Sequence, residues 1–166
     1  QLCLMTAQIA NGGFKIYPKI VMDDENKVSP LDKFTPLYEN SKNIKIVQDA
    51  MFASTNEVRG TSYRSRIDDP KYQFAGKTGT AQVKKITERD RELDLKTFQI
   101  PYEERDHALY IAYGPYKNPR YAVSILVEHG GNGSTTAAPM AKKLFKTIID
   151  RHQLRESINN KKYLDI

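Results

Sequence analysis

Lys77, Thr78 and Thr80 are the residues whose types and spacing could do chemistry, because they place one amine and two hydroxyls close together. They lie in Ala75–Val83 (AGKTGTAQV), where the β-branched residues favour an extended strand. Glycine inside a strand lets another molecule approach the backbone closely. The stretch therefore predicts a strand that borders a substrate. From these residues alone, an ordinary edge strand with a solvated lysine is the alternative.

Gly76-Lys77-Thr78 also invites comparison with the phosphate loop of nucleotide-binding proteins. That motif requires a further glycine five positions before Gly76, where this chain has Lys71. A phosphate loop also opens a helix, whereas residues 80–83 continue the strand pattern. We therefore reject the nucleotide-binding interpretation.

The composition indicates one soluble globular domain, because 166 residues suffice for a single core and 39% of them are hydrophobic. The longest apolar runs fall well short of the roughly 20 residues that a membrane span needs. The net charge of +6 suggests an anionic partner. Nucleic acid is not expected, since lysines and arginines alternate with acids and form no recognised binding motif. An anionic lipid surface, acidic cell-wall material or a carboxylate-bearing substrate remain open.

Neither a metal nor a cofactor is predicted. Cys3 is the single cysteine, which excludes an intrachain disulfide and a cysteine-cluster metal site, and its apolar neighbours predict a buried, inert thiol. The three histidines, His107, His129 and His152, lack the spacing of metal ligands.

Three helices are predicted from apolar periodicity. The first covers 1–10 and ends at two glycines; it lacks a capping residue, which suggests that the chain was cut from a longer protein. The second covers about 43–57. The third has Thr135 or Thr136 as its cap and Pro139 in its first turn, and we expect the polar tail at 153–166 to fray.

The strand predictions give an α+β fold with a three-strand antiparallel meander. The segments are about 73–83, 107–115 and 121–128, and the short link at 116–120 requires an antiparallel pair. Phe14–Val21 predicts a short edge strand or extended arm, and 22–40 predicts a surface connection. The charged stretch 84–106 predicts a solvated loop or short surface helix, with a flap over a site as the alternative.

Several segments, in order, resemble the second half of a penicillin-binding transpeptidase domain. Their residues are most similar to those of class B, the penicillin-binding protein 2 branch. The segments are Gln1-Leu2, Ile9–Gly13, Gly76–Gln82, Arg105–Leu109, Ala112–Pro115, Glu128–Gly131 and Ala137–Pro139. Gly76–Gln82 is similar to the Lys-Thr-Gly motif that this family shares with serine β-lactamases. The resemblance covers nearly the whole chain and implies the C-terminal half of that fold, with packed helices.

What the resemblance implies is acyl transfer, in which a serine attacks the D-alanyl-D-alanine end of a peptidoglycan stem peptide and an amine resolves the acyl-enzyme into a cross-link. β-Lactams mimic that dipeptide. By match to the family, Lys77 and Thr80 are the catalytic residues: Lys77 supplies positive potential and the Thr80 N–H is one oxyanion-hole donor. The Thr78 and Thr80 hydroxyls would bind the substrate carboxylate, and Gly79 leaves room for close approach.

The sequence departs from a complete enzyme, because no serine is followed three residues later by a lysine. Ser54-Thr55-Asn56 matches the family's Ser-x-Asn box, yet it falls in a later helix, so we interpret it as chance. The resemblance therefore implies that 1–166 is a partial transpeptidase domain, inactive alone. A catalytically silent wall-binding or β-lactam-sensing module, or an unrelated basic interaction domain, are the alternatives.

The resemblance also implies a place and a partner. The parent protein would be anchored in the bacterial inner membrane, face the periplasm and act in cell-wall synthesis and cell shape, while this fragment would be soluble. In the family the sheet continues beyond the strand at 121–128 with strands encoded upstream. An exposed strand edge or apolar face attracts partners, so we expect a homo-oligomer of the fragment.

Overall fold

The computed structural model of the chain describes residues 1–18, 20, 35–85, 88–93 and 95–164. Its centre is a sheet of three antiparallel strands, β1 (Ala75–Ala81), β2 (His107–Gly114) and β3 (Tyr121–Val127), in the order β1-β2-β3. The short link between β2 and β3 leaves no alternative to an antiparallel pair. The predicted α+β meander is confirmed.

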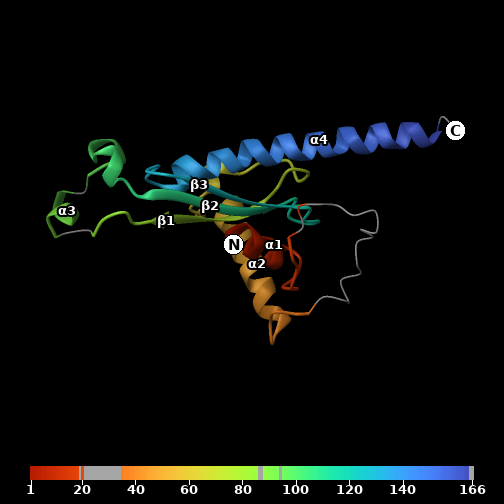
Figure 1. The fold of residues 1–166 in the computed structure, drawn as a ribbon, viewed down its shortest axis with the longest axis horizontal. Helices are drawn as coiled ribbons and strands as arrows, with labels where there is room; N and C mark the ends of the chain where they lie inside the picture. The colour runs from red at the N-terminus through yellow and green to blue at the C-terminus, as the bar shows by residue number, and fades with distance from the viewer. Residues whose placement is uncertain (19, 21–34, 86–87, 94, 165–166) are drawn as a thin grey trace.

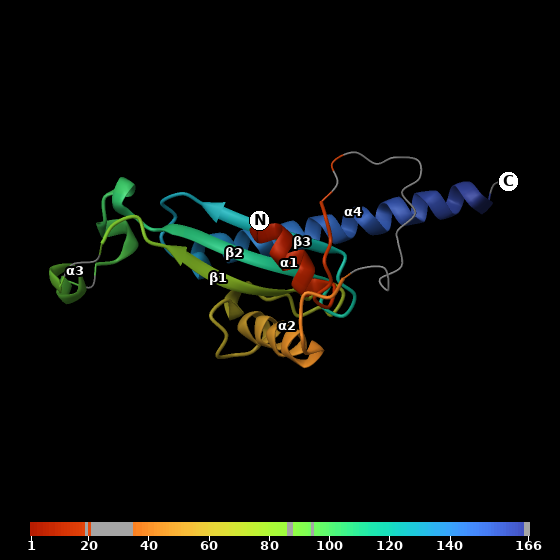
Figure 2. The ribbon, with the colours of Figure 1, turned by 60° about the horizontal axis from the view of Figure 1, so that its bottom comes forward.

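Helices cover both faces of this sheet (Figure 1). Helix α4 (Ala138–Leu164) lies along one face, and α1 (Leu2–Ala10) and α2 (Ser41–Asn56) lie on the other. Figure 2 shows α1 over β2 and β3, with α2 beside β1. The helices predicted at 1–10 and 43–57 are confirmed, and α2 begins earlier because the Asn40 side chain accepts a hydrogen bond from the Lys42 N–H.

Two hydrophobic cores result, one on each face of the sheet, because alternate residues of a strand point to opposite faces. The α4 core is built around Phe74, Tyr110 and Phe145, all fully buried, with small alanines between them. The second core joins Met51, Ala75 and Tyr113 to the inner faces of α1 and α2. The sheet is therefore a shared wall between two layers.

The start of the last helix differs from the prediction. A π-helical turn, η5 (Gly133–Ala137), leads directly into α4, and Asn132 provides the cap in place of Thr135 or Thr136. The Asn132 side-chain oxygen accepts from both the N–H and the hydroxyl of Ser134, each at 2.8 Å. The asparagine is in an extended conformation one residue before the turn, which is the geometry that a cap requires.

Replacing Asn132 by alanine is expected to lower the free energy of unfolding by about 1 kcal/mol, because the orphan N–H of Ser134 loses its acceptor. Urea unfolding followed by circular dichroism measures the change. The matched control is Thr135→Ala. Thr135 is exposed, and its hydroxyl makes a long hydrogen bond, at 3.4 Å, to the Asn132 carbonyl oxygen. A control as damaging as Asn132→Ala would show that the asparagine is not the cap.

Helix α4 continues as far as Leu164, because residues 151–164 contain neither glycine nor proline to end it. The expected fraying of the tail at 153–166 stays a prediction, and residues 165 and 166 lie outside the described part. Two further predictions are corrected. Cys3 is exposed rather than buried, although its thiol faces the sheet and donates to the Ala122 carbonyl oxygen on β3. The strand alternative for Phe14–Val21 is wrong, because only Phe14 forms an isolated bridge, with Pro36, and residues 15–18 and 20 form no strand. The extended arm stays a prediction, and residues 19 and 21 lie outside the described part.

The charged segment after β1 contains the short helix α3 (Glu88–Leu93) and two 3-10 turns, Thr97–Gln99 and Tyr102–Glu104. It extends beyond the end of the sheet (Figure 1), which confirms a charged surface segment with a short helix. Of the predicted connection at 22–40, residues 22–34 lie outside the described part. In the portion of the chain that is described, no helix combines the length and the apolar character needed to cross a bilayer.

Candidate active site

β1 is an edge strand of the sheet, and it carries all four residues predicted for the site. Lys77 and Gly79 point to one face, and Thr78 and Thr80 to the other, because side chains alternate along a strand. Lys77 and Thr80 are exposed, whereas Thr78 and Gly79 are half-buried. The arrangement puts an amine, two hydroxyls and an open backbone edge within one short stretch of chain.

The Lys77 side chain folds over its own strand towards the next residue, Thr78. Its Nζ donates to the Thr78 carbonyl oxygen at 2.9 Å and lies 3.4 Å from the Thr78 hydroxyl. An ammonium has three N–H donors and no acceptor, so a donor remains for a ligand. The pair can therefore present a positive charge and a hydroxyl to one anionic group.

A third threonine joins the site, and the sequence analysis missed it. The Thr61 hydroxyl lies 3.4 Å from the Thr78 hydroxyl and 3.2 Å from the Ser54 hydroxyl at the end of α2. Thr61 lies outside every motif that the sequence singles out. The neighbouring Gly60 is the signal that could have indicated it, because a Cβ there would lie 2.3 Å from the Ser54 carbonyl oxygen.

A buried polar cluster holds this part of the chain against β1. The Tyr110 hydroxyl lies 2.9 Å from the Thr55 hydroxyl and 3.1 Å from the Ser62 hydroxyl. Burial raises the pKa of the Tyr110 phenol, while the hydrogen bonds to Ser62 and Thr55 lower it in part. The phenol stays neutral at physiological pH, so it acts as a fixed connector.

Gly76 makes that cluster possible. A Cβ on Gly76 would lie 2.4 Å from the Tyr110 hydroxyl oxygen, so the tyrosine ring passes directly over this residue. Gly76, which directly precedes the Lys-Thr-Gly motif, thus leaves the space through which Tyr110 reaches Thr55 on α2.

A shallow cavity of about 300 Å³ adjoins Lys77 on the α2 side. Ser54 and Thr61 line it, together with two charged residues of the turn after α2, Glu57 and Arg59. Its charges are mixed, with two cations and one carboxylate. Lys77 and Arg59 can pair there with the anionic group of a ligand.

The Ser-x-Asn match at Ser54–Asn56 has a structural explanation. The Asn56 side-chain amide donates to the carbonyl oxygens of Phe52 and Phe74, each at 3.0 Å, so it joins α2 to the chain just before β1. Thr55 is fully buried. These contacts give Asn56 and Thr55 structural roles, while Ser54 lines the cavity. The interpretation of the match as chance stays a prediction.

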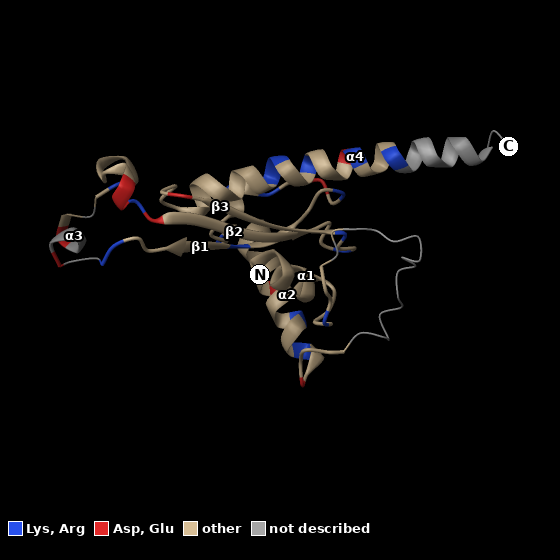
Figure 3. Ribbon diagram, in the orientation of Figure 1, with Lys and Arg blue, Asp and Glu red and all other residues tan. Residues whose placement is uncertain are grey.

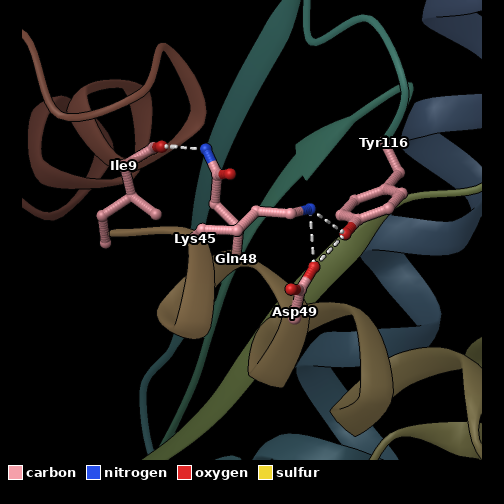
Figure 4. Close-up of polar contacts among 5 residues, drawn as sticks. All are labelled: Ile9, Lys45, Gln48, Asp49 and Tyr116. Atoms are coloured by element: carbon pink, nitrogen blue, oxygen red, sulfur yellow. Dashed lines mark hydrogen bonds and ion pairs between the residues drawn. The ribbon is translucent and has the colours of Figure 1, made fainter. Parts of the chain in front are cut away.

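Another polar cluster lies elsewhere on α2 and has a structural role (Figure 4). The Lys45 ammonium and the Tyr116 hydroxyl both donate to the Asp49 carboxylate, at 2.7 and 2.6 Å. The hydrogen bond from Lys45, followed by that from Tyr116, lowers the pKa of the Asp49 carboxyl. With the Gln48 amide donating to the Ile9 carbonyl, the cluster fastens α2 to α1 and to the β2–β3 turn.

Two of the histidines make main-chain contacts. The His107 Nδ1 accepts from the His129 N–H at 2.9 Å, and the His129 ring lies 3.1 Å from the Arg105 carbonyl oxygen. Within the described residues, no group of three His, Cys, Asp or Glu side chains could hold a metal ion. Figure 3 shows basic residues spread over α2, α4 and the connecting segments, with acidic residues among them, so the positive charge is dispersed.

Comparison with known families adds to this geometry. Residues 1–149 match the model of the penicillin binding protein transpeptidase domain. Among curated proteins, peptidoglycan D,D-transpeptidase MrdA of Haemophilus influenzae is 32% identical over 156 residues, which is 91% of this chain and 23% of that protein. MrdA of Salmonella typhimurium is 36% identical over 63% of this chain and 16% of its own length. The chain thus spans about a fifth of the length of these relatives.

Solved structures give the same result. A Pseudomonas aeruginosa PBP2 crystal structure in complex with WCK 5153 is 31% identical over 87% of this chain and 29% of that chain, with a TM-score of 0.63. Penicillin-binding protein 2B of Streptococcus pneumoniae, at 18% identity over 91% of this chain and 24% of its own, has a TM-score of 0.61 and shows the fold alone.

Proposed function

Because the chain belongs to the penicillin-binding protein transpeptidase family, we propose that it forms the Lys-Thr-Gly-bearing part of a peptidoglycan D,D-transpeptidase of the penicillin-binding protein 2 type. One observation carries the proposal: Lys77, Thr78, Gly79 and Thr80 lie on an edge strand with Lys77 and Thr80 exposed. An edge strand can accept an extended peptide as an additional strand.

The substrate is a peptidoglycan stem peptide, and β-lactams compete for the same strand. The Thr80 N–H polarises the reacting carbonyl as one oxyanion-hole donor, and the loss of such a donor typically costs about 3 kcal/mol of barrier. The Lys77 ammonium and the Thr78 and Thr80 hydroxyls hold the substrate carboxylate. No residue of this chain supplies a Ser-x-x-Lys nucleophile, so another part of the transpeptidase provides it. The protein acts at the periplasmic face of the inner membrane.

A chimaera tests the proposal, in which this sequence replaces the matching 156-residue segment of the Haemophilus influenzae relative. We expect fluorescent penicillin to label it, and Lys77→Ala to slow that acylation about a hundredfold, because the ammonium assists proton transfer and attracts the carboxylate. Lys85→Ala, an exposed lysine beyond β1, is the control. Equal labelling of the two variants would contradict the proposal. This chain alone should form no penicilloyl adduct in a mass spectrum.

We also propose that the isolated chain associates with itself. Among the described strands, β3 pairs with β2 alone, and Leu126 on β3 and Met5 on α1 are both exposed. Unpaired strand edges and exposed apolar side chains favour pairing with another copy. Light scattering should therefore give a mass above one chain at high concentration, and a monomer throughout the range would refute this.

A further inference from the structure

We propose that Thr61 is a further ligand-binding residue of the site on β1, and that Tyr110 positions it. The inference rests on the proposed function, which makes β1 the strand that binds a substrate carboxylate. Thr61 is outside the Lys77–Thr80 motif and reaches the site from the turn that follows α2.

The contacts form a row of polar groups that ends at the lysine. The Ser54 hydroxyl lies 3.2 Å from that of Thr61, which lies 3.4 Å from that of Thr78, and the Lys77 ammonium lies 3.4 Å from Thr78 in turn. A hydroxyl can accept one hydrogen bond and donate another. Thr61 can therefore accept from Ser54 and donate to the same anionic group that Thr78 and Lys77 hold.

Exposure and the cavity support a role in binding. Thr61 and Lys77 line the same cavity of about 300 Å³, and both side chains are exposed. An exposed threonine on a turn has no packing role that would require its hydroxyl. Its place beside the lysine is the feature that a ligand would use.

The turn that carries Thr61 is fixed on both sides. Before it, the Gly60 N–H donates to the Glu57 carbonyl oxygen at 2.8 Å, and a Cβ on Gly60 would collide with the α2 main chain. After it, the N–H and the hydroxyl of Ser62 both donate to the Ser54 carbonyl oxygen, at 3.0 Å each. Thr61 therefore has little freedom to move from Thr78.

Tyr110 adds the contact between this turn and the sheet. The Tyr110 hydroxyl lies 3.1 Å from that of Ser62, the residue next to Thr61. Tyr110 is also the β2 residue that pairs with Thr78 of β1. The phenol thus adds a direct link between the turn that carries Thr61 and the strand next to Thr78.

The test is a titration of this chain with benzylpenicillin, followed by backbone and methyl NMR shifts, with the penicillin methyl ester as the uncharged comparison. Thr61→Val keeps the shape and removes the hydroxyl, so binding of the acid should weaken about fivefold to tenfold. Thr61→Ser should bind within about twofold of the unmodified chain. Thr147→Val, on the exposed side of α4, is the control and should bind normally. The ester should bind Thr61→Val and the unmodified chain equally.

A double-mutant cycle separates positioning from general stability. Tyr110→Phe should weaken binding of the acid, yet add nothing further in a chain that already carries Thr61→Val. The fold should tolerate this change, since Thr55 and Ser62 keep the main-chain acceptors Met51 and Ser54. Equal weakening in both backgrounds would reduce Tyr110 to a structural residue and overturn its positioning role.

The failure of each proposal has its own signature. If benzylpenicillin shifts no resonance of Lys77–Thr80, the role of Thr61 is overturned, whereas the proposed function fails only if penicillin does not label the chimaera. If those resonances shift and Thr61→Val binds as tightly as the unmodified chain, the Thr61 inference is overturned while the proposed function stands.

Discussion

Phe145→Ala is expected to lower the free energy of unfolding by about 4 kcal/mol, because it deletes a fully buried ring from the α4 core. The Phe145 ring stacks on Phe74 with centroids 4.9 Å apart, and it also lies under Gly114 at the end of β2. Truncation leaves a cavity between α4, the residue that precedes β1 and the end of β2, and the paired strands limit how far the sheet can collapse into it.

Urea unfolding followed by far-UV circular dichroism measures this effect, since the sequence has no tryptophan for fluorescence. The matched control is Leu144→Ala, one position away on the same helix, where the residue is 38% exposed. For this variant we expect the free energy of unfolding to fall by about 1 kcal/mol or less. Similar losses for the two variants would mean that α4 is not docked on the sheet through Phe145.

Gly76→Ala should lower the free energy of unfolding by about 3 kcal/mol or more, because the new methyl group displaces Tyr110. The new Cβ would lie 2.4 Å from the tyrosine oxygen and 2.5 Å from its ring carbon Cζ, so the whole ring must leave. The hydroxyl then loses Thr55 and Ser62 while it is still surrounded by protein. A buried polar group without a partner adds its own penalty to the steric one.

The comparison variant is Gly79→Ala on the same strand, where the nearest atom to a new Cβ is the Leu109 Cβ at 3.3 Å. Leu109 need shift by only a few tenths of an ångström to make room. Alanine also makes the unfolded chain less flexible, which offsets part of the cost, so we expect the free energy of unfolding to fall by about 1 kcal/mol or less. Equal urea midpoints for the two variants would show that Tyr110 does not cross β1 at Gly76.

The strands, the meander and the family could be predicted from the sequence, because each depends on local patterns. Alternation in 107–114 and 121–127 and the short link between them define the hairpin. The lysine strand and its flanking motifs indicated the penicillin-binding protein 2 branch, and the family comparison confirms it. The roles assigned to Lys77, Thr78, Gly79 and Thr80 stay predictions.

What the sequence could not give are contacts between residues far apart along the chain. Thr55, Ser62 and Tyr110 meet only after α2 and β2 are placed against β1, and no local pattern pairs them. Thr61 was missed for the same reason. The cap at Asn132 was assigned to the wrong residue, because asparagine and two threonines compete at neighbouring positions and only backbone geometry distinguishes them.

The two cores on opposite faces of the sheet divide the molecule into layers that need not open together. The α4 layer draws on residues from 74 to 149, whereas the other layer depends on the first two helices. Cooperative units in proteins often coincide with such supersecondary groupings. Detachment of α1 and α2 could therefore occur as a separate sub-global opening, with the hairpin and α4 still folded beneath it.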